Sequence, residues 1–427
     1  MHESVSKGVD WMQTGAKKFN GRGWYLVFIN AIMGCTIAAS YSQFSMVVGQ
    51  LSDYTGISQE FLMTTDTIKS FTVVVAMMIS GAVYKRLGLK FTFIFCLAAY
   101  IIPQLVIPIN KSAAILVAMK ILQGLATISF PVFLLTIMSA MDASQTGTAT
   151  AVFNGIFYAG GGIGGTIAGY VIAATNSWTS SFYVVAGMAL VVGIIWLLTV
   201  KAPEEKEVPA DAAAEPAEQP KKNNVLFNPL TYLLVLSFFA TTWVTQTVGM
   251  DIPIYAADLG YDTLTSGKLM NAITIGILLA CLFSGKISDF LANRSQNRAQ
   301  ARLSVLMVGP IGIVLCVIAM NLADLTNFGV FFVITFLLTF FGAWGLRVFY
   351  SILPEMFHPD EVSTVTGVAG GLADLGMPIG PTVVGVIFGA KGMWNLGWYS
   401  CAGIAIVGIL CGLILMGYSR KRAKVNA

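Results

Sequence analysis

The side chains that could do chemistry in this sequence are a few ionisable residues placed inside long apolar runs. Lys120, Arg347 and Asp374 each lie several helical turns from the nearest polar segment. A charged side chain at the centre of a membrane is unfavourable by about 2.5 to 3.5 kcal/mol, so each of these residues needs a partner or a function. Because the cations outnumber the acid, binding of an anion is favoured.

Lys120 lies about eight residues, or roughly 12 Å, inside its apolar run. Gln123, Thr127 and Phe130 fall on or near the same helical face. This face is suited to a polar organic molecule. The alternative is that Lys120 extends along the helix to place its charge at the membrane surface.

Arg347 and Asp374 are predicted to lie at equal depth, roughly 15 to 17 Å from one membrane surface. Equal depth makes them candidate partners. The pair either holds two helices together or switches when a substrate competes for Arg347, in which case Asp374 becomes the proton-sensitive group. Trp344 and Tyr350 share the face of Arg347 and offer aromatic surface to a substrate, although packing explains each equally well.

The remaining charges in or near apolar runs are predicted to be structural. Asp66, Lys69 and Asp251 are interpreted as helix-end charges, and Glu355 and His358 as a solvated helix cap. The six cysteines lie in apolar runs without metal or disulfide spacing. No metal cluster, nucleophile–base pair or phosphate loop is present in the sequence, so we expect no cofactor and no enzyme activity.

The elements that position these residues are predicted from composition. Hydrophobic residues make up 56% of the 427 and charged residues 11%, against about a quarter charged in soluble proteins. The chain is therefore predicted to be an all-α integral membrane protein. Twelve apolar runs have spanning length. They are Trp24–Val48, Asp66–Tyr84, Phe91–Ile109, Ala113–Ala140, Thr148–Ala174, Phe182–Val200, Leu230–Ala256, Ser266–Gly285, Leu303–Ala323, Phe328–Phe349, Val362–Gly389 and Leu396–Tyr418.

A linker at residues 201–224 divides the chain into two near-equal halves. Its prolines and charges can neither pack a core nor cross a bilayer. We predict five segments. They are a cytoplasmic N-terminal segment (1–23), a first six-helix bundle (24–200), a cytoplasmic linker (201–224), a second six-helix bundle (225–418) and a cytoplasmic tail (419–427).

The basic residues predict the orientation. With an even number of spans, only Lys111, Lys268 and Lys391 fall on the side opposite the termini, and the other lysines and arginines outside the spans fall on the terminal side. Positive charge marks the cytoplasmic face, so both termini and the linker are predicted to be cytoplasmic.

The two halves resemble each other. Residues 163–166 (IGGT) match residues 379–382 (IGPT), and the same register pairs Gly160 with Gly376 and Gly169 with Gly385. The loop GAVYKRLGLK after the second span corresponds to the loop GKISDFLANR after the eighth span. Such internal repeats are typical of transporters that bind substrate between their halves.

The sequence resembles the major facilitator superfamily over essentially the whole chain, and these two loops carry the resemblance. The first loop is similar to that family's G-x-x-x-D-R-x-G-R-K signature at Gly81 and Arg86, with Lys85 in place of the aspartate. The second copy keeps Gly285 and the acid, Asp289. The resemblance implies that Gly81, Arg86, Gly285 and Asp289 form a cytoplasmic gate.

Two further stretches carry the resemblance into the spans. Lys120, Gln123 and Gly124 resemble the family's R-x-x-Q-G element, with lysine replacing arginine. The stretch GTATAVFNG at residues 147–155 is similar to the organic anion:cation symporter branch. Members of that branch have an Asp-Arg pair at the end of span one, whereas the residues around Tyr41 in this sequence are uncharged. The resemblance implies two pseudo-symmetric bundles and alternating access around a midplane substrate.

From these features we expect a secondary transporter of a small organic carboxylate with an apolar or aromatic body. The substrate-binding residues are predicted to be Lys120, Arg347, Gln123, Tyr41, Trp344 and Tyr350, with Phe130 covering the ligand and Asp374 coupling transport to a proton in symport. The alternative is a proton-driven exporter of lipophilic or cationic compounds, and a third class is a membrane enzyme or sensor. We expect a monomer in the cell membrane whose partners are the substrate, a coupling ion and the lipid bilayer, with no nucleic acid.

Overall fold

The computed structural model describes residues 21–141, 143–201, 228–357 and 359–425, and every regular element in these ranges is a helix. Eleven helical stretches in them are long and apolar enough to cross a membrane. They are Gly21–Thr55, Gln59–Ile109, Ala113–Ala140, Thr148–Thr175, Thr179–Thr199, Pro229–Asp258, Thr263–Arg294, Arg298–Leu322, Phe328–Met356, Val368–Lys391 and Trp394–Lys421. The predicted all-α membrane fold is confirmed.

The second of these stretches is a hairpin of two crossings. Its main helix, α3 (Gln59–Val106), has 48 residues and would extend about 70 Å if straight, more than twice the hydrocarbon thickness. Gly88 breaks it with φ 70° and ψ 175°, a conformation that favours glycine. In the arm before Gly88, the Lys69 ammonium lies over the ring of Tyr41. In the arm after Gly88, Gln104 donates a hydrogen bond to the side chain of Gln43. The two arms therefore return to the same level, so this one stretch contains two of the predicted spans, Asp66–Tyr84 and Phe91–Ile109.

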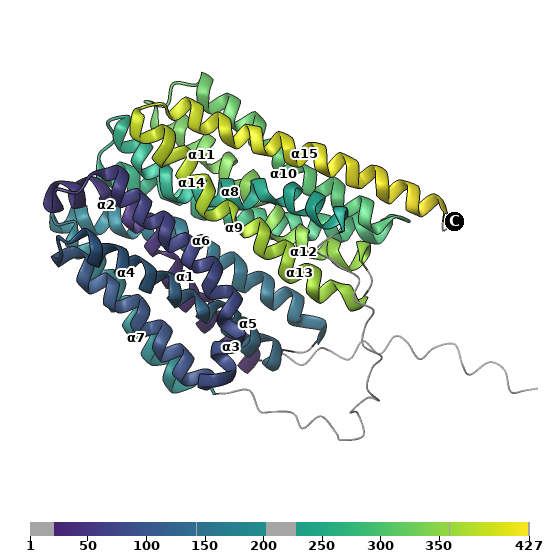
Figure 1. The fold of residues 1–427 in the computed structure, drawn as a ribbon, viewed down its shortest axis with the longest axis horizontal. Coiled ribbons are helices and arrows are strands. Elements are labelled where there is room, and N and C mark those ends of the chain that lie inside the picture. The colour runs from purple at the N-terminus through teal and green to yellow at the C-terminus, as the bar shows by residue number, and fades with distance from the viewer. Residues whose placement is uncertain (1–20, 142, 202–227, 358, 426–427) are drawn as a thin grey trace, which may run out of the picture.

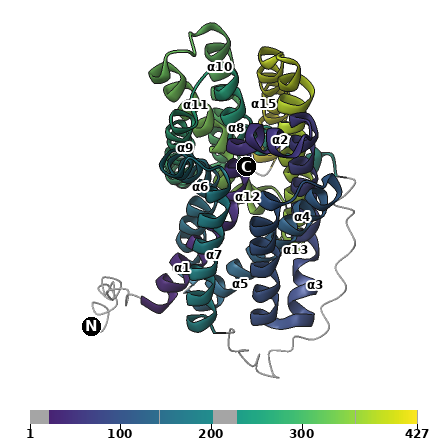
Figure 2. The same cartoon turned by 90° about the vertical axis from the view of Figure 1, so that its left-hand side faces the viewer.

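The helices form two groups that lie side by side (Figure 1), and Figure 2 shows α1, α3, α4, α5 and α7 on one side and α9, α10, α11 and α15 on the other. The first group comprises α1 (Gly21–Ala38), α2 (Ser40–Thr55), α3, η1 (Ile107–Ile109), α4 (Ala113–Leu125), η2 (Ala126–Ile128), α5 (Ser129–Ala140), α6 (Ala143–Thr175) and α7 (Thr179–Thr199). The second comprises α8 (Pro229–Asp258), α9 (Thr263–Arg294), α10 (Arg298–Leu322), α11 (Phe328–Ala343), α12 (Gly345–Met356), α13 (Pro359–Asp374), α14 (Gly376–Pro381), η5 (Thr382–Phe388), η6 (Gly389–Lys391) and α15 (Trp394–Val425).

Helix starts follow local sequence signals. Ser58, Asp262, Asn297 and Asn327 each accept a hydrogen bond from a backbone N–H in the first turn of the helix that follows. The backbone and side-chain hydrogen bonds from Thr265 hold the pKa of Asp262, which lies outside the spans, below its usual range. These caps fix where α3, α9, α10 and α11 begin.

The internal repeat has a structural counterpart. Gly160 and its partner Gly376 lie where an added Cβ would collide with Cys35 and Trp243, in the first helices of the two halves. An added Cβ at Gly169 would collide with Gly267 of α9. One at its partner Gly385 would collide with Met63 of α3 and with Asp251 of its own bundle, so both positions closely approach the other bundle. Matched glycines thus make matched close approaches.

The bundles are joined at the end of the molecule opposite the linker, which we call the far end. The end where α7 stops and α8 begins is the linker end. At the far end α6 packs along α9, α2 packs against α8, and Thr67 and Thr382 share a hydrogen bond of 2.8 Å between the bundles. Phe44, Leu51 and Met63 of the first bundle belong to the same hydrophobic core as the second bundle. The far end is therefore closed.

Candidate functional site

A cavity of about 570 Å³ lies between the two bundles, toward the linker end. Such a volume accommodates a small organic molecule. Both bundles line it, with polar groups from α6, α12 and α13 placed among apolar side chains. The lining includes Phe130, Thr150, Asn154, Tyr158, Cys281, Arg347, Tyr350, Ser351 and Asp374.

Arg347 and Asp374 face this cavity from neighbouring helices, as their predicted depth suggested. The predicted ion pair between them is absent, since no salt bridge involving either is formed within the described residues. The cavity itself supplies the physical reason, because each side chain borders open space instead of the other. Tyr350 and Phe130 also reach the cavity, so four predicted residues are brought together.

Trp344 is not brought into the cavity. Its indole is 5% exposed and donates a hydrogen bond of 2.8 Å to the Val305 carbonyl of α10. Helix α11 ends just before this residue and α12 begins just after it. Trp344 packs in the core of the second bundle. The prediction that it shares the face of Arg347 and offers aromatic surface to a substrate is therefore wrong.

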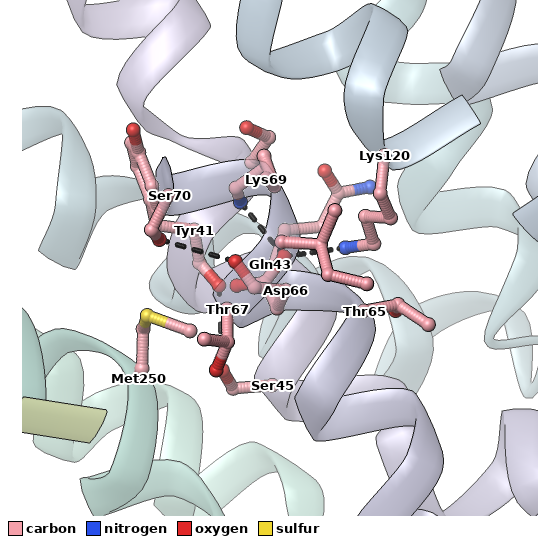
Figure 3. Close-up of polar contacts among 12 residues, drawn as sticks. Tyr41, Gln43, Ser45, Thr65, Asp66, Thr67, Lys69, Ser70, Lys120 and Met250 are labelled. Carbon is pink, nitrogen blue, oxygen red and sulfur yellow. Dashed lines mark hydrogen bonds and ion pairs between the residues drawn. The ribbon is translucent and has the colours of Figure 1, made fainter. Parts of the chain in front are cut away.

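Lys120 belongs to a buried ionic cluster centred on Asp66, the Asp66 triad (Asp66, Lys69 and Lys120; Figure 3). The ammonium groups of Lys120 and Lys69 lie 2.6 and 2.9 Å from the same oxygen, Asp66 Oδ1. All three side chains are at most 2% exposed. Lys69 lies over the ring of Tyr41 and Lys120 over that of Phe44, so aromatic faces supply further stabilisation of the cations.

The prediction that Asp66 and Lys69 are helix-end charges is therefore wrong. Helix α3 begins at Gln59, about two turns before Asp66, so the start of the apolar run is not the start of the helix. Gln123 is also buried on α4, 4% exposed, and its Oε1 has no hydrogen-bond partner within the described residues.

A smaller cavity of about 40 Å³ lies between the large cavity and Tyr41, whose ring contacts Lys69 of the triad. Tyr41 and Thr127 line the smaller cavity, and Tyr158 and Met77 line both cavities. Lys120 itself does not line the large cavity in this conformation. Tyr41, with Lys69 over its ring, therefore separates the triad from the space that Arg347 faces.

Comparison with known proteins agrees with this architecture. The family model described as Major Facilitator Superfamily matches residues 28–308, about two thirds of the chain. The chain belongs to the major facilitator superfamily. It is accordingly a multi-pass membrane protein of a transporter family and not an enzyme.

Two curated relatives of this superfamily member carry transporter names. The probable galactarate/D-glucarate transporter GudP of Bacillus subtilis (strain 168) is 23% identical over 329 residues, covering 71% of this chain and 70% of the relative. The hexuronate transporter of the same organism is 26% identical over 285 residues, covering 62% and 63%. Both names describe transport of organic acids.

The two copies of the superfamily's loop signature differ in structure. In the second half, Arg302 is 8% exposed and lies 2.9 Å from Asp289 and 3.6 Å from Glu355. Arg298 adds a contact of 3.2 Å to Glu355, which is therefore an ion-pair partner and not the solvated cap predicted. Gly285 lies beside Arg347 on the same side of the molecule.

In the first half, Arg86 and Gly81 are exposed, and Arg86 forms no ion pair with any residue the structure describes. Lys85, standing where the family's signature has an acid, explains the difference. His358, predicted to be part of a cap, lies outside the described residues.

Sequence reasoning missed the polar lining of α6, Asn154 and Tyr158, and the burial of Asp251, which is 1% exposed. Asp251 lies two turns before the end of α8 at Asp258, so it is inside the helix and is not the helix-end charge predicted. For Tyr158 the signal was the repeat, since residue 158 aligns with the cavity residue Asp374 in the predicted register, whereas the register gives no such signal for Asn154.

Proposed function

We propose that this protein moves a small organic anion, a carboxylate, across the cell membrane by alternating access. The observation that carries the proposal is Arg347, a cation that faces a cavity shared by both bundles and has no anionic partner among the described residues. A half-buried cation within a membrane span is unfavourable without a partner, so the cavity favours an anionic ligand. The organic-acid transporter names of the two relatives support the same class.

The rest of the lining favours a carboxylate that also carries hydroxyl groups. Asn154, Tyr158, Tyr350 and Ser351 supply amide and hydroxyl groups around the cavity. Arg347 can hold a carboxylate through two parallel hydrogen bonds, and the neutral donors can bond hydroxyls. Phe130 covers one wall.

Lys120, Gln123 and Tyr41 are proposed to contribute to substrate binding from the first bundle. Lys120 and Lys69 together carry one positive charge more than Asp66 neutralises, and the smaller cavity bordered by Tyr41 leads toward them. An anion held between this excess charge and Arg347 would contact both bundles, and its binding energy would then depend on how the bundles are tilted.

We propose proton symport as the coupling mode, with Asp374 as the proton-sensitive group. Asp374 lines the same cavity as Arg347, so protonation of the acid and binding of the anion would alter the charge of one shared space. The Arg302–Asp289 contact beside Gly285 is proposed to act as the gate at the linker end, with Gly81 and Arg86 in the first-half copy. Both termini are proposed to be cytoplasmic.

The second candidate, a proton-driven exporter of cationic compounds, is supported by Asp374, an acid in the cavity with no basic partner within ion-pair distance among the described residues. The two candidates predict opposite preferences for ligand charge.

The test is uptake into proteoliposomes of radiolabelled D-glucarate, D-glucuronate and tetraphenylphosphonium. We expect uptake of at least one of the acids and its loss in Arg347→Ala. Arg347→Lys should retain only part of the uptake, because an ammonium cannot form the two parallel hydrogen bonds. Arg294→Ala, at the exposed end of α9, is the matched control and should transport normally. Uptake of the phosphonium beyond that of protein-free liposomes, with uptake of neither acid, would replace the anion carrier with the exporter.

A further inference from the structure

A second acid lies at the closed far end, apart from the cavity. Asp251 belongs to α8 of the second bundle and is 1% exposed. Its Oδ2 atom has no hydrogen-bond partner within the described residues, and no salt bridge there includes it. An ionised carboxylate in such surroundings is strongly unfavourable, whereas a neutral carboxylic acid is tolerated far better.

The space beside Asp251 is small and spans both bundles. A cavity of about 10 Å³ is lined by Asp251, by Asp66 of the first bundle and by the hydroxyl-bearing residues Ser45 and Thr67. This volume holds at most one water molecule. The other lining residues, including Phe44 and Met250, are apolar. A hydrated or fully coordinated metal cation therefore has too little space and too few oxygen ligands, whereas a proton needs neither.

The local backbone accommodates this carboxyl group. Gly385 contacts it from η5, a π-helical turn, and an added Cβ at residue 385 would collide with Asp251 Oδ1. π-helical turns inside α-helices occur frequently at functional sites.

The charged groups facing Asp251 come from one direction. From α3 it faces Asp66, whose Oδ1 is held by Lys69 and by Lys120 of α4. The groups packed near it from α2 and η5 are uncharged, and α15 contributes the thiol of Cys401. Both lysines lie on Asp66 and neither forms a salt bridge with Asp251 within the described residues, so no direct ion pair compensates the ionised form of Asp251.

We propose that Asp251 is a proton-binding site that is loaded from the solution at the far end and must be occupied for that end to close. When the bundles separate at the far end, water reaches Asp251 and solvates its carboxylate. A proton from that water adds to a carboxylate oxygen, the group becomes neutral, and the apolar walls can then close over it. This site goes beyond the proposed coupling by Asp374, which lines the cavity at the linker end, and it does not depend on which substrate is carried.

The experiment measures opening of the far end directly, without substrate. The native cysteines are first replaced by serine. Val48→Cys then places a thiol at a position that is 3% exposed and lines the cavity of about 10 Å³ beside Asp251. Its rate of labelling by a maleimide is measured in detergent between pH 5.5 and 8.5. Each rate is divided by that of Gln59→Cys, an exposed position near the same end, which removes the intrinsic pH dependence of thiol reactivity.

We expect the ratio to be low at acidic pH and to rise with pH, by up to about tenfold per pH unit, the limit for one linked proton. Asp251→Asn should give a low ratio at every pH, because the amide is uncharged, and Asp251→Glu should keep a pH-dependent ratio. Asp258→Asn is the matched control, since Asp258 is exposed two turns further along α8, and it should behave as the unsubstituted protein.

A flat ratio in the protein with Asp251 intact, or an undiminished pH dependence in Asp251→Asn, would overturn the proposal. If NaCl but not KCl lowered the labelling ratio at constant pH, the site would be assigned to sodium instead of a proton. Failure of the substrate-uptake test would leave these labelling results unaffected, so the two proposals can be refuted separately.

Discussion

The cavity at the linker end and the closed far end contain the same types of charged residue in opposite arrangements. At the far end Asp66 and two lysines share one carboxylate oxygen and are almost completely buried. In the cavity Arg347 and Asp374 border open space without pairing to each other. The difference shows that depth in the membrane does not decide pairing, because helix packing closes the first region and leaves the second hollow.

The same comparison distinguishes residues that pack the helices from residues that could bind a substrate or a coupling ion. Gly160 and Gly376 make equivalent close approaches in the two halves, whereas the triad exists only in the first half and Arg347 only in the second. Symmetric packing residues are therefore explained by the fold, and the asymmetric charges are the residues to associate with substrate and coupling ion.

The largest effect is expected at the triad. Asp66→Asn leaves Lys69 and Lys120 buried without their shared acid and should lower the free energy of unfolding by about 3 to 5 kcal/mol, the range for breaking a buried ion pair. The measurement is the thermal midpoint of the purified protein in detergent, with the exposed Asp53→Asn as control. Equal midpoints for the two variants would mean that the triad contributes little.

A smaller loss of stability is expected when only one cation of the triad is removed. In Lys120→Met, Asp66 keeps its 2.9 Å contact with Lys69, so only one charge-assisted hydrogen bond is lost, about 1.5 to 3 kcal/mol. Because Lys120 is proposed to bind substrate, uptake of the labelled acid should fall more than stability does. A variant with normal uptake would restrict the role of Lys120 to structure.

The acid in the cavity should affect pH dependence and leave stability nearly unchanged. Asp374→Asn removes a carboxylate without an ion-pair partner among the described residues, so the thermal midpoint should stay close to that of the unsubstituted protein. Uptake of labelled acid measured from pH 5.5 to 8 should lose its pH dependence, which for one coupled proton is at most about tenfold per unit. If the variant retained the full pH profile, Asp374 would not be the coupling group.

The all-α membrane fold and the glycine register could be predicted because they depend on local quantities, namely the length of apolar runs and the spacing of small residues. The Asp66 triad could not, because it depends on which faces of α3 and α4 meet. Asp66 and Asp251 lie near the ends of apolar runs, yet their helices continue beyond those runs. Trp344 shows the same limit, since its hydrogen bond to Val305 on another helix decides its direction.

The smallest effect is expected at the linker-end ion pair, although its distance resembles those of the triad. Asp289 lies 2.9 Å from Arg302 but is 66% exposed, and exposed ion pairs contribute about 0.2 to 1 kcal/mol. In Asp289→Ala, Arg302 would keep Glu355 and the hydroxyls of Ser288 and Ser351 as partners. The thermal midpoint should therefore change little, while uptake changes if the contact acts as a gate. Arg302→Ala should lower the midpoint more, since Arg302 is 8% exposed and also pairs with Glu355. A large drop for Asp289→Ala would show that solvent exposure is a poor guide to the strength of this pair.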